Sequence, residues 1–183
     1  MEPETKSADL SARPGLRAGK LIYLSLGSNR GDRLANLRRA MEELGKAGVN
    51  IQRASSFYKT EPVDFAPQAW FLNCAVEALT PLMPRQLLKA VKSVERAMGR
   101  RPGVHKGPRA IDIDILLYEN VVVRTEALTI PHERMNDRRF VLVPLSELAP
   151  AARHPVSRRT VAEILHDAPD RSQVIRYKPE IAD

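Results

Sequence analysis

The stretch at residues 107–117, GPRAIDIDILL, alternates isoleucine with aspartate, and this alternation constrains the fold more than any other feature. Successive side chains of a β-strand point to opposite faces of the sheet. The isoleucines therefore share one face, whereas Asp112 and Asp114 share the other. The stretch predicts a strand with one buried apolar face and one face that carries two carboxylates, about 7 Å apart.

Two carboxylates on one strand face have two explanations. Aspartate is uncommon in strands, and Mg²⁺ usually binds one or two carboxylates together with substrate phosphates. The alternative is an outer strand face that simply contacts water. Arg109 and Lys106 precede the aspartates closely, and Arg100, Arg101 and His105 lie just before them. Cations crowded beside carboxylates favour a site for a metal ion and phosphates.

The composition fits a soluble domain that binds an anion. The chain has 183 residues, 43% of them hydrophobic, and a net charge of +7. This length suggests one domain with a full core, and the charge is compatible with a nucleotide, a nucleic acid or an anionic membrane surface. The chain has one cysteine, Cys74, and this count excludes an internal disulfide and a multi-cysteine zinc site. Cys74 lies in an apolar strand pattern and is expected to be an inert buried thiol.

We expect no membrane span in this chain and no secretory signal in residues 1–20. No apolar run has the length of a membrane span, and residues 1–20 lack the apolar centre of a secretory signal. We expect residues 1–20 to be a disordered extension, residues 21–170 to form the folded domain and residues 171–183 to be a tail. The expected location is cytoplasmic.

Periodicity predicts the order strand, helix, strand, strand, helix, strand. Strands are expected at residues 21–26, 51–58 and 71–79 and in the aspartate stretch, a tight turn at 27–31, and later helices at 140–148, interrupted near Pro144, and after the capping residue Thr160. This order is that of an α+β fold with a ferredoxin-like βαββαβ core, an antiparallel sheet with helices on one face, here with C-terminal additions.

This topology gathers polar residues on the open face of the sheet. In the usual strand order, the third and fourth strands flank the first. Phe71 and Asn73 would then lie roughly 10 Å from Asp112 and Asp114 on the same face. An aromatic ring, an amide and two carboxylates suit a small ligand, and the segment from His132 to Phe140 is expected to cover them.

Six short motifs together resemble the hydroxymethyl-dihydropterin pyrophosphokinases, a family of folate-pathway enzymes. The motifs are Gly107-Pro108-Arg109-x-x-Asp112-Ile113-Asp114-Ile115-Leu116, Leu26-Gly27-Ser28-Asn29, Ser56-x-Tyr58-x-Thr60-Glu61-Pro62, Phe71-Leu72-Asn73, Gly99-Arg100 and Leu128-x-x-Pro131-His132. Each motif is weak alone, but all six occur in the family's order. The resemblance covers about residues 21 to 168.

The resemblance implies transfer of pyrophosphate from ATP to the hydroxymethyl group of 6-hydroxymethyl-7,8-dihydropterin, with release of AMP. It implies that Arg100, Arg109, Asp112 and Asp114 are catalytic and that the two aspartates bind two Mg²⁺ ions. The implied ATP-binding residues are Glu95, Arg100, Lys106, Arg109, Ile113, Thr129, His132 and Arg138. The implied pterin-binding residues are Thr60, Val63, Phe71, Asn73, Asp112 and Phe140, with the two phenylalanines on opposite faces of the ring. A monomer whose partners are these small molecules, with no nucleic acid and no membrane, is expected.

The sequence departs from the enterobacterial members of this family in three places. The loop at 100–106 is one residue shorter, with Pro102 in place of a second arginine and Lys106 in place of a tryptophan. Ala127 replaces an arginine. These differences concern the motion of the loop and the number of phosphate contacts, and Arg101 or His105 would have to supply any missing cation.

Two other functions remain compatible with parts of the sequence. A ferredoxin-like nucleic-acid-binding module would explain the positive charge. Sheets that bind RNA present several aromatic residues with basic neighbours, whereas this face presents two carboxylates that would repel phosphates. A two-metal nuclease would also use paired aspartates near basic residues. Release of AMP from ATP in the presence of the pterin would distinguish the pyrophosphokinase from both.

Overall fold

The computed structural model describes residues 19–62, 68–100 and 107–178. The predicted site residues Val63 and Lys106 and nearly all of the predicted N-terminal extension lie outside these ranges. The elements are β1 (Lys20–Ser28), α1 (Arg33–Lys46), β2 (Asn50–Ala54), β3 (Tyr58–Thr60), β4 (Phe71–Thr80), α2 (Pro84–Ala97), β5 (Asp112–Tyr118), β6 (Val123–Arg124), β7 (Thr129–Ile130), the 3₁₀ helix η1 (Met135–Asp137), α3 (Arg139–Leu148), α4 (Val161–Asp167) and β8 (Val174–Arg176).

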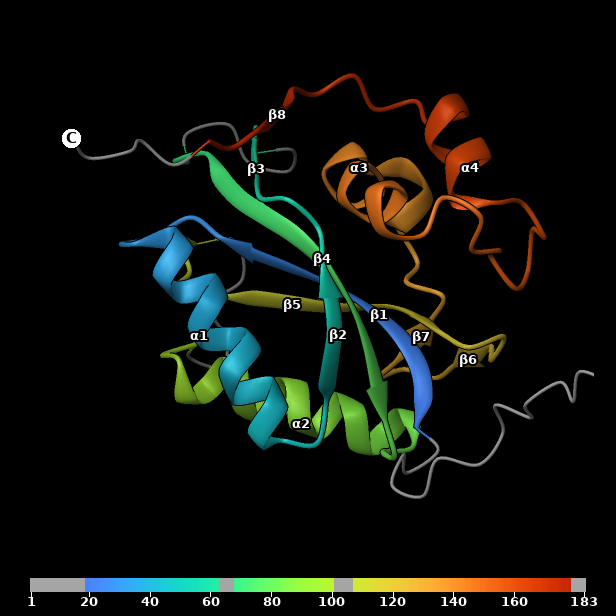
Figure 1. Ribbon diagram of the computed structural model, residues 1–183, viewed down its shortest axis with the longest axis horizontal. Helices are drawn as coiled ribbons and strands as arrows, with labels where there is room; N and C mark the ends of the chain where they lie inside the picture. Colours follow the sequence, from blue (N-terminus) through green and yellow to red (C-terminus); the bar gives the residue numbers. More distant parts are fainter. Residues whose placement is uncertain (1–18, 63–67, 101–106, 179–183) are drawn as a thin grey trace, which may run out of the picture.

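A six-stranded antiparallel sheet organises the described chain (Figure 1). Its order is β5-β1-β4-β3-β8, and β2 also pairs with β4. The central position of β1 between β4 and β5 confirms the expected neighbours of the first strand. A separate two-stranded hairpin is formed by β6 and β7. The sheet therefore brings β4 and β5, which carry the predicted site residues, to either side of β1.

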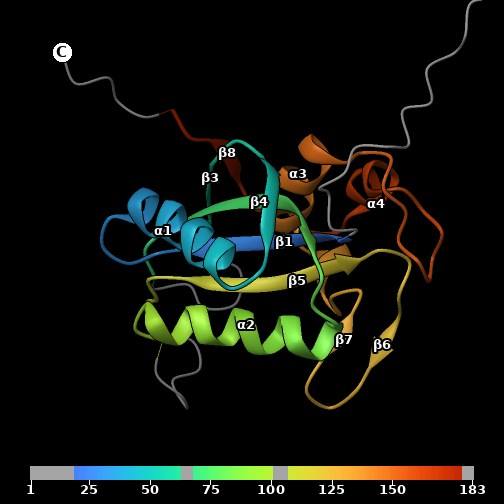
Figure 2. The same cartoon turned by 60° about the horizontal axis from the view of Figure 1, so that its bottom comes forward.

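The helices α1 and α2 cover one face of this sheet (Figure 2). Ile22, Leu24 and Leu26 of β1 are fully buried there, as the alternation along that strand predicts. They pack in one core cluster with Leu37 of α1 and Leu87 of α2. Burying the apolar face of the sheet against two amphipathic helices is the main hydrophobic contribution to the fold.

The helix α3, with α4 packed against it, covers part of the opposite face, so the expectation of helices on one face holds only for α1 and α2. A second core cluster joins Ala75 and Leu117 of the sheet to Val141, Leu142 and Leu145 of α3. Ala75 lies on the face of β4 that was expected to be open, and it is 1% exposed. The sheet thus has helices on both faces, and the second face is open only where α3 does not reach.

Several boundaries differ from the prediction because pairing and burial outweigh the local signals. Gly27 and Ser28 continue β1, and the turn begins after them, with Gly31 at φ +63°. Asp32 caps α1, since its carboxylate accepts a hydrogen bond from the amide of Ala35. The helix α3 continues through Pro144. Proline removes one helical hydrogen bond, but the buried apolar face of α3 holds the helix in place.

The C-terminal region differs most from the prediction. The segment expected to be a tail, residues 171–183, contains β8, which pairs with β3 at the edge of the sheet. The predicted strand at 51–58 is two strands, β2 and β3, which both pair with β4. No interval of alternating apolar residues marks β8, because an edge strand of three residues buries little.

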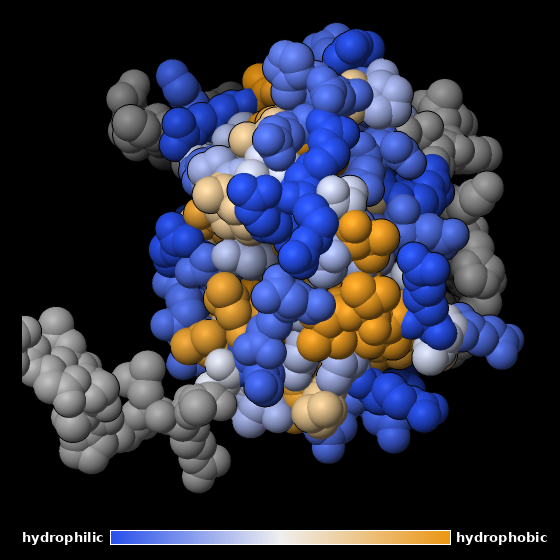
Figure 3. Space-filling view, turned by 90° about the vertical axis from the view of Figure 1, so that its right-hand side faces the viewer, coloured by the Kyte–Doolittle hydropathy of each residue, from blue (hydrophilic) through white to orange (hydrophobic). Residues whose placement is uncertain are grey.

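The outer surface mixes hydrophobic and hydrophilic residues. Figure 3 shows hydrophobic residues among charged ones on one side of the molecule. The large hydrophobic side chains that are exposed among the described residues are Leu21, Met83, Val122, Val156 and Ile175. None of the helices in the described parts of the chain is long and apolar enough to cross a membrane. Cys74 is fully buried, and burial raises its pKa to about 12, which confirms an inert thiol.

Candidate active site

The register of the sheet places three site residues in one row. Gly27 of β1 lies opposite Asn73 of β4 on one side and opposite Asp112 of β5 on the other. A Cβ atom at Gly27 would overlap the side-chain oxygen of Asn73. Gly27 is therefore required for space beside the Asn73 amide, and not for the turn that the sequence suggested.

A cavity of about 300 Å³ opens over this row. It brings together most of the predicted pterin-binding residues with the predicted catalytic residues. Its lining consists of Ser25, Gly27, Thr60, Glu61, Pro62, Gln68, Phe71, Asn73, Arg100, Arg109, Asp112, Asp114, Arg138 and Phe140. All of the predicted pterin-binding residues that the structure describes line this one cavity.

One wall of the cavity combines an amide with an aromatic ring. Asn73 is 3% exposed, and its Nδ2 donates a hydrogen bond of 2.6 Å to Oγ1 of Thr60. Phe71 lies two residues before it on the same strand face. Phe140 comes from the first turn of α3, and the guanidinium of Arg138 lies 5.5 Å from the centre of its ring. Two aromatic rings and a fixed amide suit a flat heterocycle with a polar edge.

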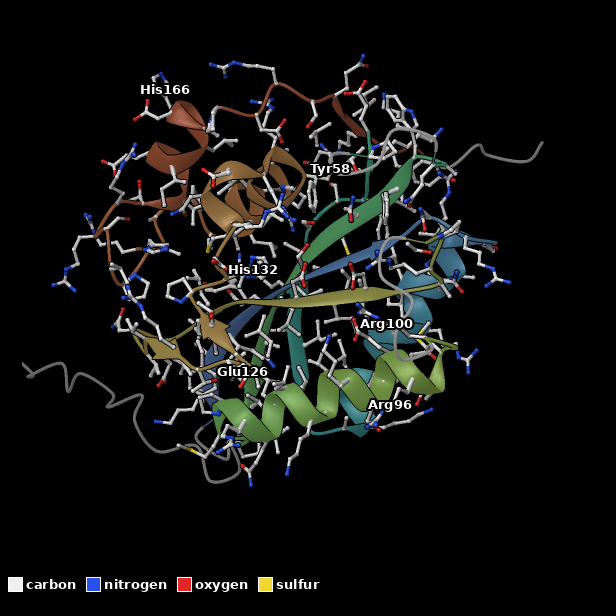
Figure 4. The ribbon with its side chains drawn as sticks, turned by 180° about the vertical axis from the view of Figure 1, so that it is seen from behind. Tyr58, Arg96, Arg100, Glu126, His132 and His166 are labelled. Carbon is white, nitrogen blue, oxygen red and sulfur yellow. The ribbon has the colours of Figure 1, made fainter. Side chains whose placement is uncertain are left out.

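The carboxylate of Asp112 is held between two arginines. Its Oδ1 accepts a hydrogen bond of 2.7 Å from Arg100, and its Oδ2 accepts one of 3.0 Å from Arg109. Figure 4 shows Arg100 between α2 and β5. Both arginines thus lie at the cavity with part of their charge balanced by Asp112, where phosphates could compete for them.

Glu95 lies beneath this pair and is fully buried. Its carboxylate pairs with Arg100 and with Lys92, and it accepts a hydrogen bond of 2.9 Å from the backbone amide of Ile113. Glu95 lines neither this cavity nor the next one. In this position Glu95 holds Arg100 and the start of β5.

A second cavity, of about 350 Å³, lies on the other side of Asp114. Its lining consists of Leu88, Val91, Lys92, Ile113, Asp114, Ile115, Glu126, Ala127, Leu128, Thr129, His132, Glu133, Arg134 and Arg138. Four residues of the predicted ATP set, Ile113, Thr129, His132 and Arg138, meet here. Because Asp114 and Arg138 line both cavities, the two adjoin at this pair.

The second cavity holds a carboxylate and an imidazole whose protonation is shifted. Burial raises the pKa of Asp114, and the neighbouring Asp112 raises it further, while His132 and Arg138 oppose the shift. Burial lowers the pKa of His132, against the effect of Asp114, whose Oδ1 lies 3.8 Å from His132 Nε2. His132 is seen near β5 in Figure 4. A neutral imidazole at neutral pH follows.

The donors present fit a magnesium ion that is shared with phosphates. The described residues contain no group of three or more His, Cys, Asp or Glu side chains that could enclose a metal ion. Two carboxylates on one strand face would both be stabilised by a divalent cation. Since Mg²⁺ keeps ligands from water and substrate phosphates, Asp112 and Asp114 suffice as protein ligands.

Sequence patterns did not identify several residues that line the two cavities or hold their linings in place. Asn29 was read only as part of a motif, yet its Oδ1 accepts a hydrogen bond from the amide of Arg109 and its Nδ2 donates one to Gln68. Lys92 and Arg134 line the second cavity. The helical spacing of Lys92 from Glu95 could have indicated the first of these, whereas Gln68 and Arg134 carry no local signal.

Comparison with known proteins identifies the family of this chain. The family model for 7,8-dihydro-6-hydroxymethylpterin-pyrophosphokinase matches residues 23–150. A 2-amino-4-hydroxy-6-hydroxymethyldihydropteridine pyrophosphokinase of Bacillus subtilis is 46% identical over 129 residues, which cover 70% of this chain and 77% of that protein. The mitochondrial folate synthesis bifunctional protein of Pisum sativum is 47% identical over 127 residues, 69% of this chain.

The pea protein is much longer, and this chain spans 25% of its length. Among solved structures, one titled as an HPPK-DHPS A437G protein of Plasmodium falciparum has a TM-score of 0.64 at 16% identity. That match covers 81% of this chain and 45% of the other, and at this identity it supports the fold alone. The family match extends over more than half of the residues and includes the aspartate strand. The chain belongs to the 7,8-dihydro-6-hydroxymethylpterin-pyrophosphokinase family.

Proposed function

We propose that the protein transfers pyrophosphate from ATP to the hydroxymethyl group of 6-hydroxymethyl-7,8-dihydropterin in folate biosynthesis. One observation carries this proposal, namely that two cavities of different chemistry adjoin at Asp114 and Arg138. The first combines two aromatic rings and an amide with arginines. The second combines an imidazole with both basic and acidic side chains, and its described lining contains no aromatic ring of a phenylalanine, tyrosine or tryptophan. A flat heterocycle and a nucleotide triphosphate would meet at the carboxylates of β5.

The first cavity would orient the pterin. The ring would lie between Phe71 and Phe140, while the Asn73 amide, held by Thr60, would pair with the polar edge of the ring. The hydroxymethyl group would then point toward Asp112 and the arginines that line the same cavity. Fixing this group close to the attacked phosphorus removes much of the entropic barrier of a two-substrate reaction.

The second cavity would orient ATP. Release of AMP requires that the hydroxyl loses its proton, that its oxygen bonds to the β-phosphorus and that the bond between this phosphorus and the α-phosphate oxygen breaks, so that AMP leaves with that oxygen. Asp112, which lines the pterin cavity, would accept the proton. Arg100 and Arg109, which line the first cavity, would exchange their contacts with Asp112 for contacts with the charged phosphate oxygens. His132, Thr129 and Arg138 of the second cavity would contact the nucleotide. Positioned cations contribute most to phosphoryl-type transfer, and the buried Glu95 would keep Arg100 in place.

Two Mg²⁺ ions, when bound by Asp112 and Asp114 together with the phosphates, would neutralise the phosphate charge and hold the phosphates in line. The chain's own contribution is the pair of carboxylates on a rigid central strand. Since Asp112 also pairs with both arginines, binding of the ions and of the phosphates would redistribute these contacts. The number of ions is part of the proposal.

We also propose a ferredoxin-like description of the core, supported by the order β5-β1-β4 with β2 beside β4. The folded unit would include β8 and hence extend beyond the expected limit at residue 170. A monomeric, cytoplasmic enzyme without nucleic-acid or membrane partners remains the proposal. Because α3 covers part of the second sheet face, a small ligand is favoured as the binding partner. RNA is disfavoured because RNA-binding sheets of this kind need an open face.

A test of the proposal measures AMP release with purified protein, ATP, Mg²⁺ and 6-hydroxymethyl-7,8-dihydropterin. AMP should form only when all components are present, and chelation of Mg²⁺ should stop its formation. Guanine-type heterocycles without a hydroxymethyl group should not support release. AMP release that is independent of the pterin would contradict the proposal.

A further inference from the structure

A short segment after α4, residues 170–176, contacts two walls of the first cavity. In Figure 1 this segment runs from α4 past α3 and ends as β8 beside β3. One of the two walls contains Thr60 and Glu61, and the other contains Phe140. The segment follows the residues 23–150 that match the family model, and sequence analysis had interpreted its larger part as a tail.

The first contact holds β3, which has only three residues. β8 pairs with it in antiparallel register, with Val174 opposite Thr60. Beyond the strands, the amide of Gln173 donates a hydrogen bond of 2.8 Å to Oε2 of Glu61, and the amide of Glu61 donates one of 3.3 Å to the carbonyl of Gln173. Because β4 pairs with the opposite edge, β3 is fixed on both sides at the cavity.

The second contact holds the beginning of α3. The N-cap residue Arg138 makes no side-chain capping hydrogen bond. Asp170 supplies the acceptor instead, since its Oδ2 accepts a hydrogen bond of 2.8 Å from the amide of Arg139. Its Oδ1 accepts another of 2.8 Å from the amide of Ser172. The same carboxylate therefore joins the first turn of α3, which carries Phe140, to the chain that continues into β8.

The charge of Asp170 is favourable in this position. Burial acts to raise its pKa, but hydrogen bonds from the amides of Ser172 and Arg139 lower it overall. The group is thus a carboxylate at neutral pH. A negative acceptor at the beginning of a helix is stabilised by the unpaired backbone amides there.

We propose that residues 170–176 form a strap that sets the separation of the two walls of the pterin cavity, and that Asp170 is a positioning residue for the pterin. This inference rests on the proposed function of that cavity. A ring that stacks on Phe140 while its edge meets the Thr60 wall needs both walls at a fixed distance. The second cavity is built mainly from α2, β5 and residues 126–134, and Arg138 is its contribution from the start of α3. The strap does not line this cavity.

The experiment compares KM for the pterin with KM for ATP in Asp170→Ala, Asp170→Asn and the wild type. Asp170→Ala removes both acceptors. The free-energy cost of losing a helix cap sets the upper limit of the effect: if this cost falls wholly on the pterin-bound arrangement, KM for the pterin should rise by up to about fivefold to tenfold. KM for ATP should stay within about twofold. Asp170→Asn keeps an amide oxygen as an acceptor and should lie between Asp170→Ala and the wild type.

Asp167→Ala is the matched control. It removes the same charge three residues earlier, but Asp167 is exposed and pairs with Arg159 and His166 outside the cavity. Both of its KM values should equal those of the wild type. Circular dichroism and the melting temperature establish that each variant is folded at the assay temperature, and Asp170→Asn carries the test if Asp170→Ala is not folded.

The outcomes separate the strap from the proposed function. If the wild type releases no AMP with the pterin, the proposed function fails, and the strap's role in pterin binding fails with it. If the wild type is active and the Asp170 variants change both KM values equally, or neither, the strap alone is refuted. A selective rise for the pterin with partial retention in Asp170→Asn supports it, because general destabilisation would lower the active fraction without this split.

Discussion

Replacing Phe140 by alanine separates stacking from packing in the first cavity. Phe140 lines the cavity and is only partly buried against the second core cluster. Stacking of a flat base on an aromatic side chain is worth about 1–3 kcal/mol, so Phe140→Ala should weaken pterin binding about 5- to 150-fold. A fully buried phenylalanine would cost about 3–5 kcal/mol of stability, and the loss here should be below about 3 kcal/mol because the ring is only partly buried.

The assay is a fluorescence titration that uses Trp70, the one tryptophan of the chain, which directly precedes Phe71. Phe140→Leu is the matched variant, because it retains apolar volume without the ring. It should lose affinity for the pterin almost as Phe140→Ala does, but with a smaller loss of stability, and ATP affinity should change little in both. Normal pterin affinity in Phe140→Ala, together with a loss of several kcal/mol in stability, would place the residue in the core and refute stacking.

Three further predictions concern the metal ligands, the floor of the cavity and ionisation. Asp114→Asn should lower turnover by at least about a thousandfold, since loss of charge neutralisation costs several kcal/mol, with an unchanged circular dichroism spectrum; near-normal turnover would remove Asp114 from the metal site. Gly27→Ala should displace the Asn73 amide and raise KM for the pterin in a protein that is still folded at the assay temperature. A KM for the pterin equal to that of the wild type would contradict this. Tyr23 and Tyr58 each have a pKa raised to about 12, chiefly by burial and also by hydrogen bonds to glutamates. Because the raised pKa favours the neutral form in the fold, their contribution to stability is complete below about pH 10 and is lost as the pH rises toward 12; an ultraviolet titration in which Tyr58→Phe removes no late-ionising signal would refute the assignment.

The elements that the sequence predicted well are those with a regular apolar period. Leu24 and Leu26 alternate along β1, and Leu37 and Leu44 share a helical face, so burial follows from spacing alone. The shared face of Asp112 and Asp114 follows for the same reason. These local patterns were enough to place β1, α1, β4, α2 and β5 in order.

The features that the sequence did not predict depend on contacts between distant segments. The role of Gly27 depends on the register of β1 with β4, which brings Asn73 beside it. β8 forms only because β3 offers a free edge, and α3 covers the second face because Ala75 and Leu117 present an apolar surface there. Glu95 is similar, since its burial under Arg100 requires α2 to pack against β5.

The most direct test of the central claim is the identity of the product. Mass spectrometry of the reaction of ATP with 6-hydroxymethyl-7,8-dihydropterin should show a pterin that has gained two phosphates, with one AMP formed for each. This result follows if the hydroxyl held in the first cavity attacks the β-phosphorus held above Asp112 and Asp114. A pterin that carries one phosphate, with ADP as the second product, or phosphate release without a modified pterin, would contradict the account.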